Sequence, residues 1–132
     1  MTLRVASTGG AVAKRYAAYV AGWDAALEDG VRRVAMAVDN AASERLSGAG
    51  APRTYPIPVR RGFLRRSGGY RAQGREAFVF NSAIYARAHH QGFRPYGNPR
   101  AKPVPARPFL RDAFDSVDPG AIIIASLRKL LP

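Results

Sequence analysis

The chain has 132 residues, a length that suits one domain with one modest hydrophobic core. Its hydrophobic fraction of 47% and charged fraction of 23% lie near the averages for globular proteins, so disorder over the whole chain is not expected. The formal net charge of +12 favours contact with nucleic acid, an acidic protein surface or an anionic membrane. The absence of cysteine excludes disulfides, thiolate zinc sites and cysteine nucleophiles.

The sequence predicts no segment that enters a membrane. Lys14 and Arg15 interrupt the alanine-rich stretch near the amino terminus, so it lacks the apolar run of a signal peptide. No apolar run reaches the roughly 20 residues that a membrane span needs. We therefore expect a cytoplasmic or particle-bound protein with one domain over residues 1–132, in which residues 1–10 are flexible or form an edge strand.

A long amphipathic helix is predicted over residues 24–46. Its apolar residues recur at steps of three and four and share one face. They are Leu27, Val31, Val34, Val38 and Ala42. The opposite face carries Glu28, Arg32, Asp39 and Glu44, and Gly48 and Gly50 can end the helix. Residues 11–21 also favour a helix, and Gly22 leaves open whether one helix or two form.

A proline-rich extended passage and a β-hairpin are predicted next. Residues 51–62 contain three prolines that block a helix and suggest a passage along a sheet edge. Residues 63–67 form a short helical turn or begin a strand, before a flexible Gly68-Gly69. Residues 70–72 and 76–80 flank a turn and form the hairpin. Its second strand is apolar on both faces, so we expect it to be central or covered.

A short helix and a long basic loop follow. Asn81 or Ser82 can cap a helix over residues 83–91, and Gly92 suits its end. Residues 93–107 have no periodicity, contain four prolines and are rich in arginine. Loops of this length inside a compact domain are usually functional or disordered, so residues 93–107 are the leading candidate for a contact arm.

Two helical segments are predicted at the carboxyl terminus. Pro108 suits the first turn of a helix that places Leu110, Ala113, Phe114 and Val117 on one face. Asp118-Pro119 forms a second cap and start. Residues 121–131 then place apolar residues on a helical stripe, although three consecutive isoleucines leave a strand open.

No catalytic or cofactor-binding motif is present, so an enzyme, a cofactor and a metal site are not expected. His89 and His90 are adjacent and would point about 100° apart on a helix, which makes joint chelation difficult. The carboxylates belong mainly to the solvated side of the long helix. Five aromatic residues that could stack on nucleic-acid bases are expected in the core instead: Phe78, Phe80, Tyr85, Phe109 and Phe114.

Three segments, in this order, resemble the tail-completion, head-to-tail joining family of long-tailed bacteriophages. Gly62-Phe63-Leu64-Arg65-Arg66-Ser67 is similar to that family's "TG-x-L-R-x-S" turn. Asn81-Ser82-Ala83-Ile84-Tyr85-Ala86, followed by Gln91-Gly92, is similar to its strand, "YA" helix and "E-x-G" ending. Arg107-Pro108-Phe109-Leu110-Arg111-Asp112-Ala113 is similar to its "RPFLRPA" helix start. Arg61 and His90-Gln91 depart from the pattern, where the family has threonine and an acidic residue.

The resemblance covers residues 25–117 and implies an α+β fold: a long N-terminal helix on a small antiparallel β-sheet, with a short helix and a C-terminal helix. It implies a non-catalytic structural subunit of the virion neck, assembled in the host cytoplasm. The expected partners are its own copies in a ring, neighbouring neck, portal-side and tail-tube proteins, and DNA through weak non-specific contact. The structural motif residues are Gly62, Leu64, Ser67, Tyr85, Gly92, Pro108, Phe109 and Leu110.

Several alternatives remain open. Within the neck, the chain could be a tail terminator or a head stopper. Outside it, a basic nucleic-acid-binding module or a small host-directed phage effector would also fit the charge and size. The candidate interaction residues are Arg60, Arg61, Arg94, Tyr96, Arg100 and Lys102, and Arg65 and Arg66 are further basic candidates. The core joining sheet to helices is expected to contain Phe63, Leu64, Tyr85, Phe109, Leu110 and Phe114.

Overall fold

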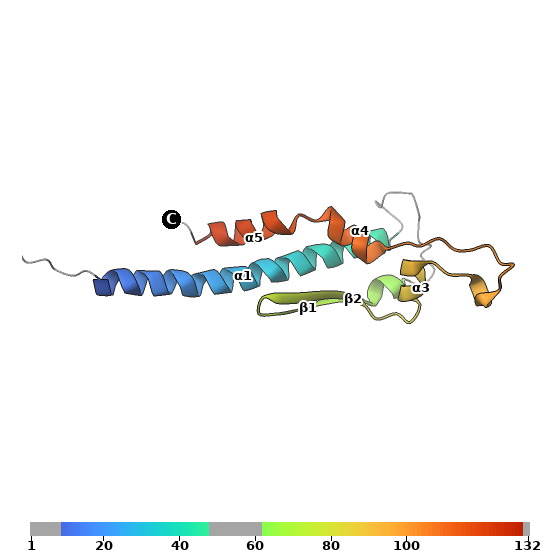
Figure 1. Cartoon of the computed structure of the whole chain (residues 1–132), viewed down its shortest axis with the longest axis horizontal. Helices are drawn as coiled ribbons and strands as arrows, with labels where there is room; N and C mark the ends of the chain where they lie inside the picture. The colour runs from blue at the N-terminus through green and yellow to red at the C-terminus, as the bar shows by residue number, and fades with distance from the viewer. Residues whose placement is uncertain (1–8, 48–61, 131–132) are drawn as a thin grey trace, which may run out of the picture.

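The computed structural model describes residues 9–47 and 62–130 and has an α+β fold. A long helix packs on a small antiparallel sheet and on shorter helices, as predicted (Figure 1). The elements in chain order are α1 (Gly9–Arg45), α2 (Phe63–Arg66), β1 (Gly68–Gln73), β2 (Glu76–Asn81), α3 (Ala86–Gln91), the 3-10 turn η1 (Pro95–Gly97), α4 (Phe109–Ser116) and α5 (Pro119–Arg128).

Helix α1 is continuous through Gly22, so the two amino-terminal helical segments form one helix. The glycine has a packing role instead. A Cβ atom at Gly22 would lie 3.2 Å from a methyl carbon of Leu130, and one at Gly30 would lie 3.2 Å from Cα of Ile123. These two positions, about two turns apart, let α5 lie close against α1. Close packing of α5 thus explains glycine inside a helix where it otherwise costs stability.

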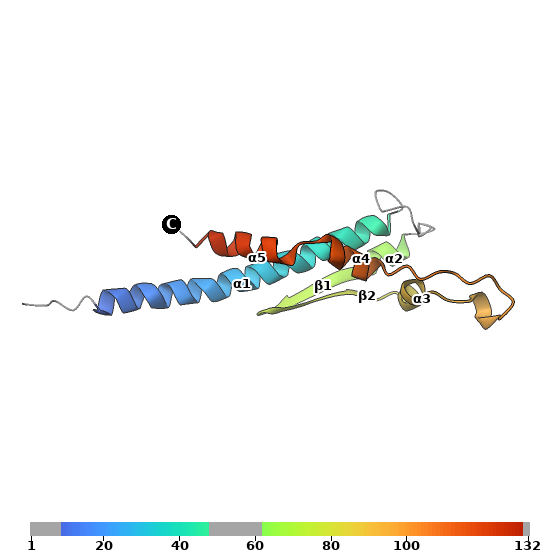
Figure 2. The ribbon, with the colours of Figure 1, turned by 45° about the horizontal axis from the view of Figure 1, so that its top comes forward.

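Helix α1 is the central element on which the hairpin and helices α2, α4 and α5 pack. The β1–β2 hairpin contacts it on one side, and α4 and α5 contact it on another (Figure 2). An ion pair between Arg75 in the hairpin turn and Asp24 also joins the hairpin to α1. The buried cluster lies towards the carboxyl end of α1 and consists of Val38, Ala42, Leu46, Leu64, Ala83, Ala86, Phe109 and Ala113. Most of these side chains are small, so Phe109, only 1% exposed, supplies the largest single buried surface.

The hairpin differs from its prediction in exposure. Strands β1 and β2 pair antiparallel, with Tyr70 opposite Val79 and the turn at Gly74-Arg75. Gly68 and Gly69 belong to β1 rather than to a flexible joint. The expectation that β2 is central or covered is wrong, because the sheet has two strands and α1 covers one face. The half-buried Val79 packs against the core, whereas Phe78 is 65% exposed.

The predicted core is correct for Leu64 and Phe109, which are buried, and Leu110 packs half-buried beside them. It is wrong for Phe63, Tyr85 and Phe114, which are exposed, and likewise for Phe78 and Phe80 on the hairpin. The cause is the thinness of the fold. Each outer element meets α1 along one face only, so the apolar side chains on its second face have no layer to cover them.

The helix starts and ends match the sequence to different degrees. The side chain of Asp118 accepts a hydrogen bond from the Ala121 amide at 3.0 Å, so it caps α5 as predicted, and residues 121–128 are helical. Asn81 Oδ1 accepts from the Ala83 amide at 3.1 Å, but α3 begins only at Ala86. Residues 51–61 of the edge passage predicted over residues 51–62, and the helix stop at residues 48–50, lie outside the described residues. No helix in the described part of the chain is long and apolar enough to cross a membrane.

Candidate interaction surface

The predicted contact arm, residues 93–107, leaves the fold as a loop closed at its base (Figure 1). Phe93 and Val104 exchange two backbone hydrogen bonds, 3.1 and 2.8 Å between nitrogen and oxygen. The Arg107 amide donates to the carbonyl of His89 in α3 at 2.8 Å. These bonds hold the two ends of the arm together, so the segment between them is presented at the end of the molecule away from the amino terminus of α1.

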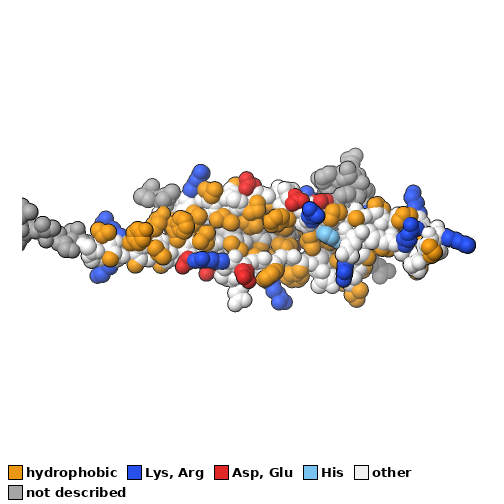
Figure 3. All heavy atoms as spheres, viewed as in Figure 1, with side chains coloured by type: hydrophobic (Ala, Val, Ile, Leu, Met, Phe, Trp, Pro, Cys, Tyr) orange, Lys and Arg blue, Asp and Glu red, His pale blue; other side chains and the backbone are white. Residues whose placement is uncertain are grey.

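The tip of the arm is ordered by its own side chains. Arg94 Nη1 donates to the carbonyls of Pro99 at 2.8 Å and Ala101 at 3.1 Å, so Arg94 braces the loop from within. Tyr96 is fully exposed, with a φ of 57° that is uncommon outside glycine. Arg100 and Lys102 are exposed and have no acidic partner among the described residues. Basic side chains mark this end of the molecule in Figure 3.

Gly92 allows the base of the arm to close. A Cβ atom there would lie 2.8 Å from the Ala106 nitrogen and 2.9 Å from the Val104 oxygen, and φ is +80° with ψ at 155°. Such a backbone conformation is nearly restricted to glycine. Gly97 at the tip also has a positive φ, +64°, but nothing lies within 4 Å of an added Cβ. A side chain at Gly92 would thus meet both an unfavourable backbone conformation and a steric clash, whereas one at Gly97 would meet only the unfavourable conformation.

We predict that Gly92→Ala destabilises the fold more than Gly97→Ala. Strain of the Gly92 kind costs about 1 to 3 kcal/mol, and the collision with the returning strand adds to it. Gly97→Ala has only the left-handed conformation to accommodate, at about 1 to 2 kcal/mol. Chemical denaturation of both variants measures the difference. Equal losses would mean that the base of the arm is not closed as described.

His89 and His90 lie on α3 and contact different aromatic partners. The His89 ring packs edge-on against Tyr85 and Phe93, with centroid distances of 5.8 and 5.6 Å. His90 packs against Phe109 at 5.8 Å. Burial, with a smaller contribution from Arg107, lowers the pKa of His89 below its usual 6.5. The neutral imidazole is therefore the form that fits this aromatic site.

A pH dependence of stability follows from His89. Because folding lowers the pKa of His89, the unfolded chain takes up its proton first, and stability falls as the pH drops through about 6.5. We expect the melting temperature to decrease between pH 7 and pH 5, and His89→Phe to have a shallower decrease than the unchanged protein. His90→Phe is the control and should keep the steeper decrease, because His89 remains. Identical pH profiles for the two variants would refute the role of His89.

The first family-like motif forms a compact structural turn. Gly62 precedes α2 with a φ of +64°, a conformation that favours glycine. Ser67 Oγ donates to the Phe63 carbonyl at 2.8 Å, and Asn81 Nδ2 donates to the Leu64 carbonyl at 2.7 Å. These bonds fix the end of α2 against β2. Pro108 occupies the position before α4, with a φ of −76°.

The remaining basic candidates fall into two groups. Arg65 and Arg66 are exposed on α2, beside the buried Leu64. Arg60 and Arg61 lie outside the described residues. The structure therefore places the arm residues Tyr96, Arg100 and Lys102 together at one exposed end, with Arg94 holding their loop, and Arg65 and Arg66 on a separate element.

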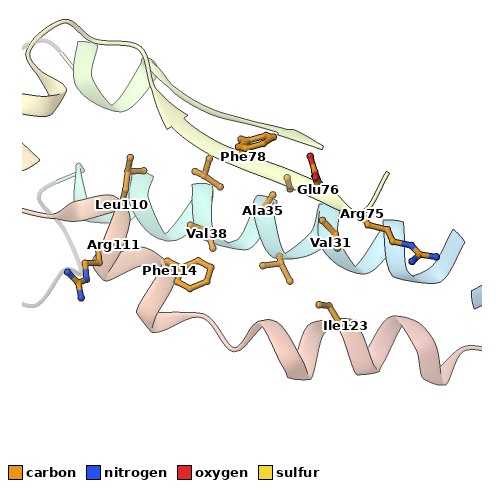
Figure 4. A pocket seen from close by; sticks show the side chains of 13 residues that line it. Val31, Ala35, Val38, Arg75, Glu76, Phe78, Leu110, Arg111, Phe114 and Ile123 are labelled. Carbon is orange, nitrogen blue, oxygen red and sulfur yellow. The ribbon is translucent and has the colours of Figure 1, made fainter. Parts of the chain in front are cut away.

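An open groove, which the sequence did not predict, runs beside α1 (Figure 4). Its volume is about 700 Å³. Val31, Val34, Ala35 and Val38 of α1 form the floor. The hairpin, including Phe78, forms one wall, and α4 and α5, including Phe114 and Ile123, form the other. Of the exposed aromatic side chains that were expected in the core, Phe78 and Phe114 line this groove. Phe63 and Tyr85 lie elsewhere and contact each other, with ring centroids 6.1 Å apart.

Among the described residues, no three His, Asp or Glu side chains are grouped to hold a metal ion. Asp29 accepts a 2.6 Å hydrogen bond from Arg33, which lowers its pKa, and Ser126 donates to it at 3.4 Å. Asp39 departs from the expected solvated face: it is half-buried, and burial raises its pKa. Comparisons of the chain with protein-family models, curated proteins and solved structures find no match.

Proposed function

We propose that this chain is a structural virion subunit of a bacteriophage neck, which completes the tail or joins head to tail as part of an oligomeric ring. The observation that carries the proposal is the meeting of the three family-like segments. Leu64 from the first, Ala83 and Ala86 from the second, and Phe109 from the third lie in one buried cluster. The three segments, which follow one another in the order found in the family, therefore also pack together. This is expected if they specify one fold.

The arm supports a role in assembly. It is closed at its base, braced by Arg94 and exposed at Arg100 and Lys102. A preordered loop loses less conformational entropy on binding than a disordered one. Its charge suits an acidic surface on a portal-side or tail-tube protein, and charge complementarity also sets the orientation of docking. In this proposal the chain is not an enzyme and acts within the virion, after assembly in the host cytoplasm.

Deleting the gene for this chain from its phage tests the proposal. We expect DNA-filled heads and separate tails to accumulate, because the joint between them is incomplete, and a copy supplied in trans to restore particles. Electron microscopy of lysates measures the outcome, and a labelled copy should lie at the neck. Normal infectious particles without the chain would overturn the assignment. A tail terminator would instead give tails of irregular length, and a head stopper would give heads that lose their DNA.

A nucleic-acid-binding module is the second candidate, favoured by the net charge of +12. Titration with non-specific duplex DNA at rising salt concentration distinguishes it. A dedicated binder that neutralises several phosphates loses affinity steeply with salt. Weak attraction that disappears at physiological salt agrees with the neck assignment, whereas tight binding there would favour the module.

A further inference from the structure

The amino-terminal half of α1 is residues 9–25, of which residues 9–21 extend beyond the elements that pack on α1, while Gly22 lies beside Leu130 and Asp24 pairs with Arg75 (Figures 1 and 2). Apart from the half-buried Gly22, each of these residues is exposed. Tyr16 is 70% exposed, and Tyr19 and Trp23, whose rings lie 6.3 Å apart, are each about 40% exposed. A helix of this length is marginal in water without a partner, so we expect a partner to stabilise this half.

The exposed apolar side chains form a stripe. Val12, Tyr16, Val20 and Trp23 follow one another at steps of four, four and three residues and share one helix face. The same spacing continues through Leu27 to the groove floor at Val31, Val34 and Val38. Lys14 lies on the opposite face, whereas Arg15 flanks the stripe beside Val12 and Tyr19. In Figure 3 the hydrophobic side chains make a band from this half of α1 towards α5 and the hairpin.

The groove has room for such a stripe. The hairpin on one side and α4 and α5 on the other leave the half-buried Val31 and Val34 accessible between them, whereas Ala35 and Val38 are already buried by this chain (Figure 4). Phe78 and Phe114, 65% and 53% exposed, stand on opposite walls. Val31 and Val34 lie about one helical turn apart, so an entering helix meets the accessible floor with side chains from one or two turns.

We propose that the amino-terminal half of α1 of one copy lies in the groove of a second copy of this chain. The stripe and the floor have the same three- and four-residue spacing, which lets the ridges of one helix pack into the grooves of another. The floor is apolar, and the charged groups Arg75, Glu76 and Arg111 stand at its margins. An acidic partner would be attracted to the basic arm instead. The stripe and the groove floor are both apolar, so each suits the other.

The available area agrees with self-association through both surfaces. At about 150–250 Å² for each aromatic side chain, Tyr16, Tyr19 and Trp23 leave roughly 300 Å² uncovered, and Phe78 and Phe114 roughly 200 Å² more. A stable interface buries about 800 Å² on each partner. The stripe alone or the groove alone falls short of about 800 Å². A copy that buries both its stripe and its groove, together with the exposed valines and alanines around them, approaches that area. In a ring, each copy would place its amino-terminal half of α1 in the groove of the next copy. In a dimer, the two copies would do so reciprocally.

Single-cysteine cross-linking tests the contact, since the chain has no cysteine of its own. A tagged Tyr16→Cys copy is mixed with an untagged Phe78→Cys copy under mild oxidation, and Val20→Cys serves as a second donor one turn further along. A disulfide requires Cα atoms within about 7 Å. We expect a mixed cross-linked pair from at least one donor, and none from Lys14→Cys, which lies off the stripe. Equal cross-linking from Lys14→Cys, or none from both donors, would overturn the proposal.

The oligomeric state gives a second measurement. We expect the unchanged protein to self-associate in light scattering and Val20→Arg to shift it to the monomer. Ala18→Arg adds the same side chain on the opposite face of α1 and should behave as the unchanged protein. Circular dichroism of both variants controls for loss of helix. A monomeric unchanged protein, or equal effects of the two variants, would contradict the contact.

This inference and the neck assignment can fail separately. If the mixed pair forms but the chain is dispensable for phage assembly, the contact stands and the neck assignment fails. If the chain enters the neck but no mixed pair forms, the reverse holds, and another segment or protein occupies the groove.

Discussion

Replacing Phe109 with alanine is expected to lower the free energy of unfolding by about 3 to 5 kcal/mol, the usual cost of truncating a fully buried phenylalanine. Phe109 is 1% exposed, and most other members of the buried cluster are small. Few neighbouring side chains can therefore move in to fill the cavity. For a domain of this size such a loss is a large part of the total stability, and chemical denaturation measures it directly.

Phe114→Ala is the matched control on the same helix. Its side chain is 53% exposed at the rim of the groove, so its removal from the isolated subunit should cost much less, roughly 1 kcal/mol. The two substitutions remove the same atoms from the same element, and only burial differs. A comparable loss at both positions would mean that Phe114 is buried in the protein as it exists in solution, for example by a second copy.

The sequence predicted the order of the elements and the type of most of them, because these have local causes, while residues 63–67 and 121–131 were left open between helix and strand. The three- and four-residue spacing of Leu27, Val31 and Val34 specifies a helix, and Asp118 with Pro119 starts another. Turn chemistry at Gly74 specifies the hairpin, which the observed positive φ of 58° agrees with. These signals depend on neighbours in the chain, so one sequence suffices to identify them.

Burial was harder to predict because it depends on how many layers the fold has. Phe63, Tyr85 and Phe114 each fall on an apolar face, and apolar faces are usually covered. Here the sheet has two strands and each peripheral element touches α1 on one side, so these faces stay open. The groove arises for the same reason and has no sequence signature of its own. The pattern identified the apolar face but not whether this chain or another copy covers it.

The contact arm was predicted only in outline. Its length, prolines and charge indicated a loop at residues 93–107, and the structure has one. The brace from Arg94 to the Pro99 and Ala101 carbonyls was not foreseen, because a long side chain can reach many acceptors in a loop of unknown shape. Arg94 was grouped with Arg100 and Lys102 by charge alone, although it holds the loop that presents the other two.

Reversing the charge of both Arg100 and Lys102 to glutamate should prevent tails from joining filled heads while the isolated subunit stays folded. Both side chains are exposed, so their removal disturbs no buried contact. An exposed ion pair contributes up to about 1 kcal/mol, and reversal replaces attraction with a similar repulsion, so two sites amount to up to about 4 kcal/mol per subunit. That difference is up to roughly 1,000-fold in affinity for an acidic neighbour, and a ring repeats it in every copy.

Lys14→Glu with Arg32→Glu is the matched control for this effect. Each double variant exchanges two positive charges for two negative ones, so both lower the formal net charge from +12 by four. Lys14 and Arg32 are exposed on α1, on the face opposite the apolar stripe, and neither belongs to the arm. We expect the yield of infectious particles to collapse for the arm variant and to stay near normal for the control, with equal melting temperatures. If both variants lost assembly equally, total charge rather than the arm would be responsible. If the arm variant assembled at normal yield, residues 93–107 would be a solvated surface and not a contact.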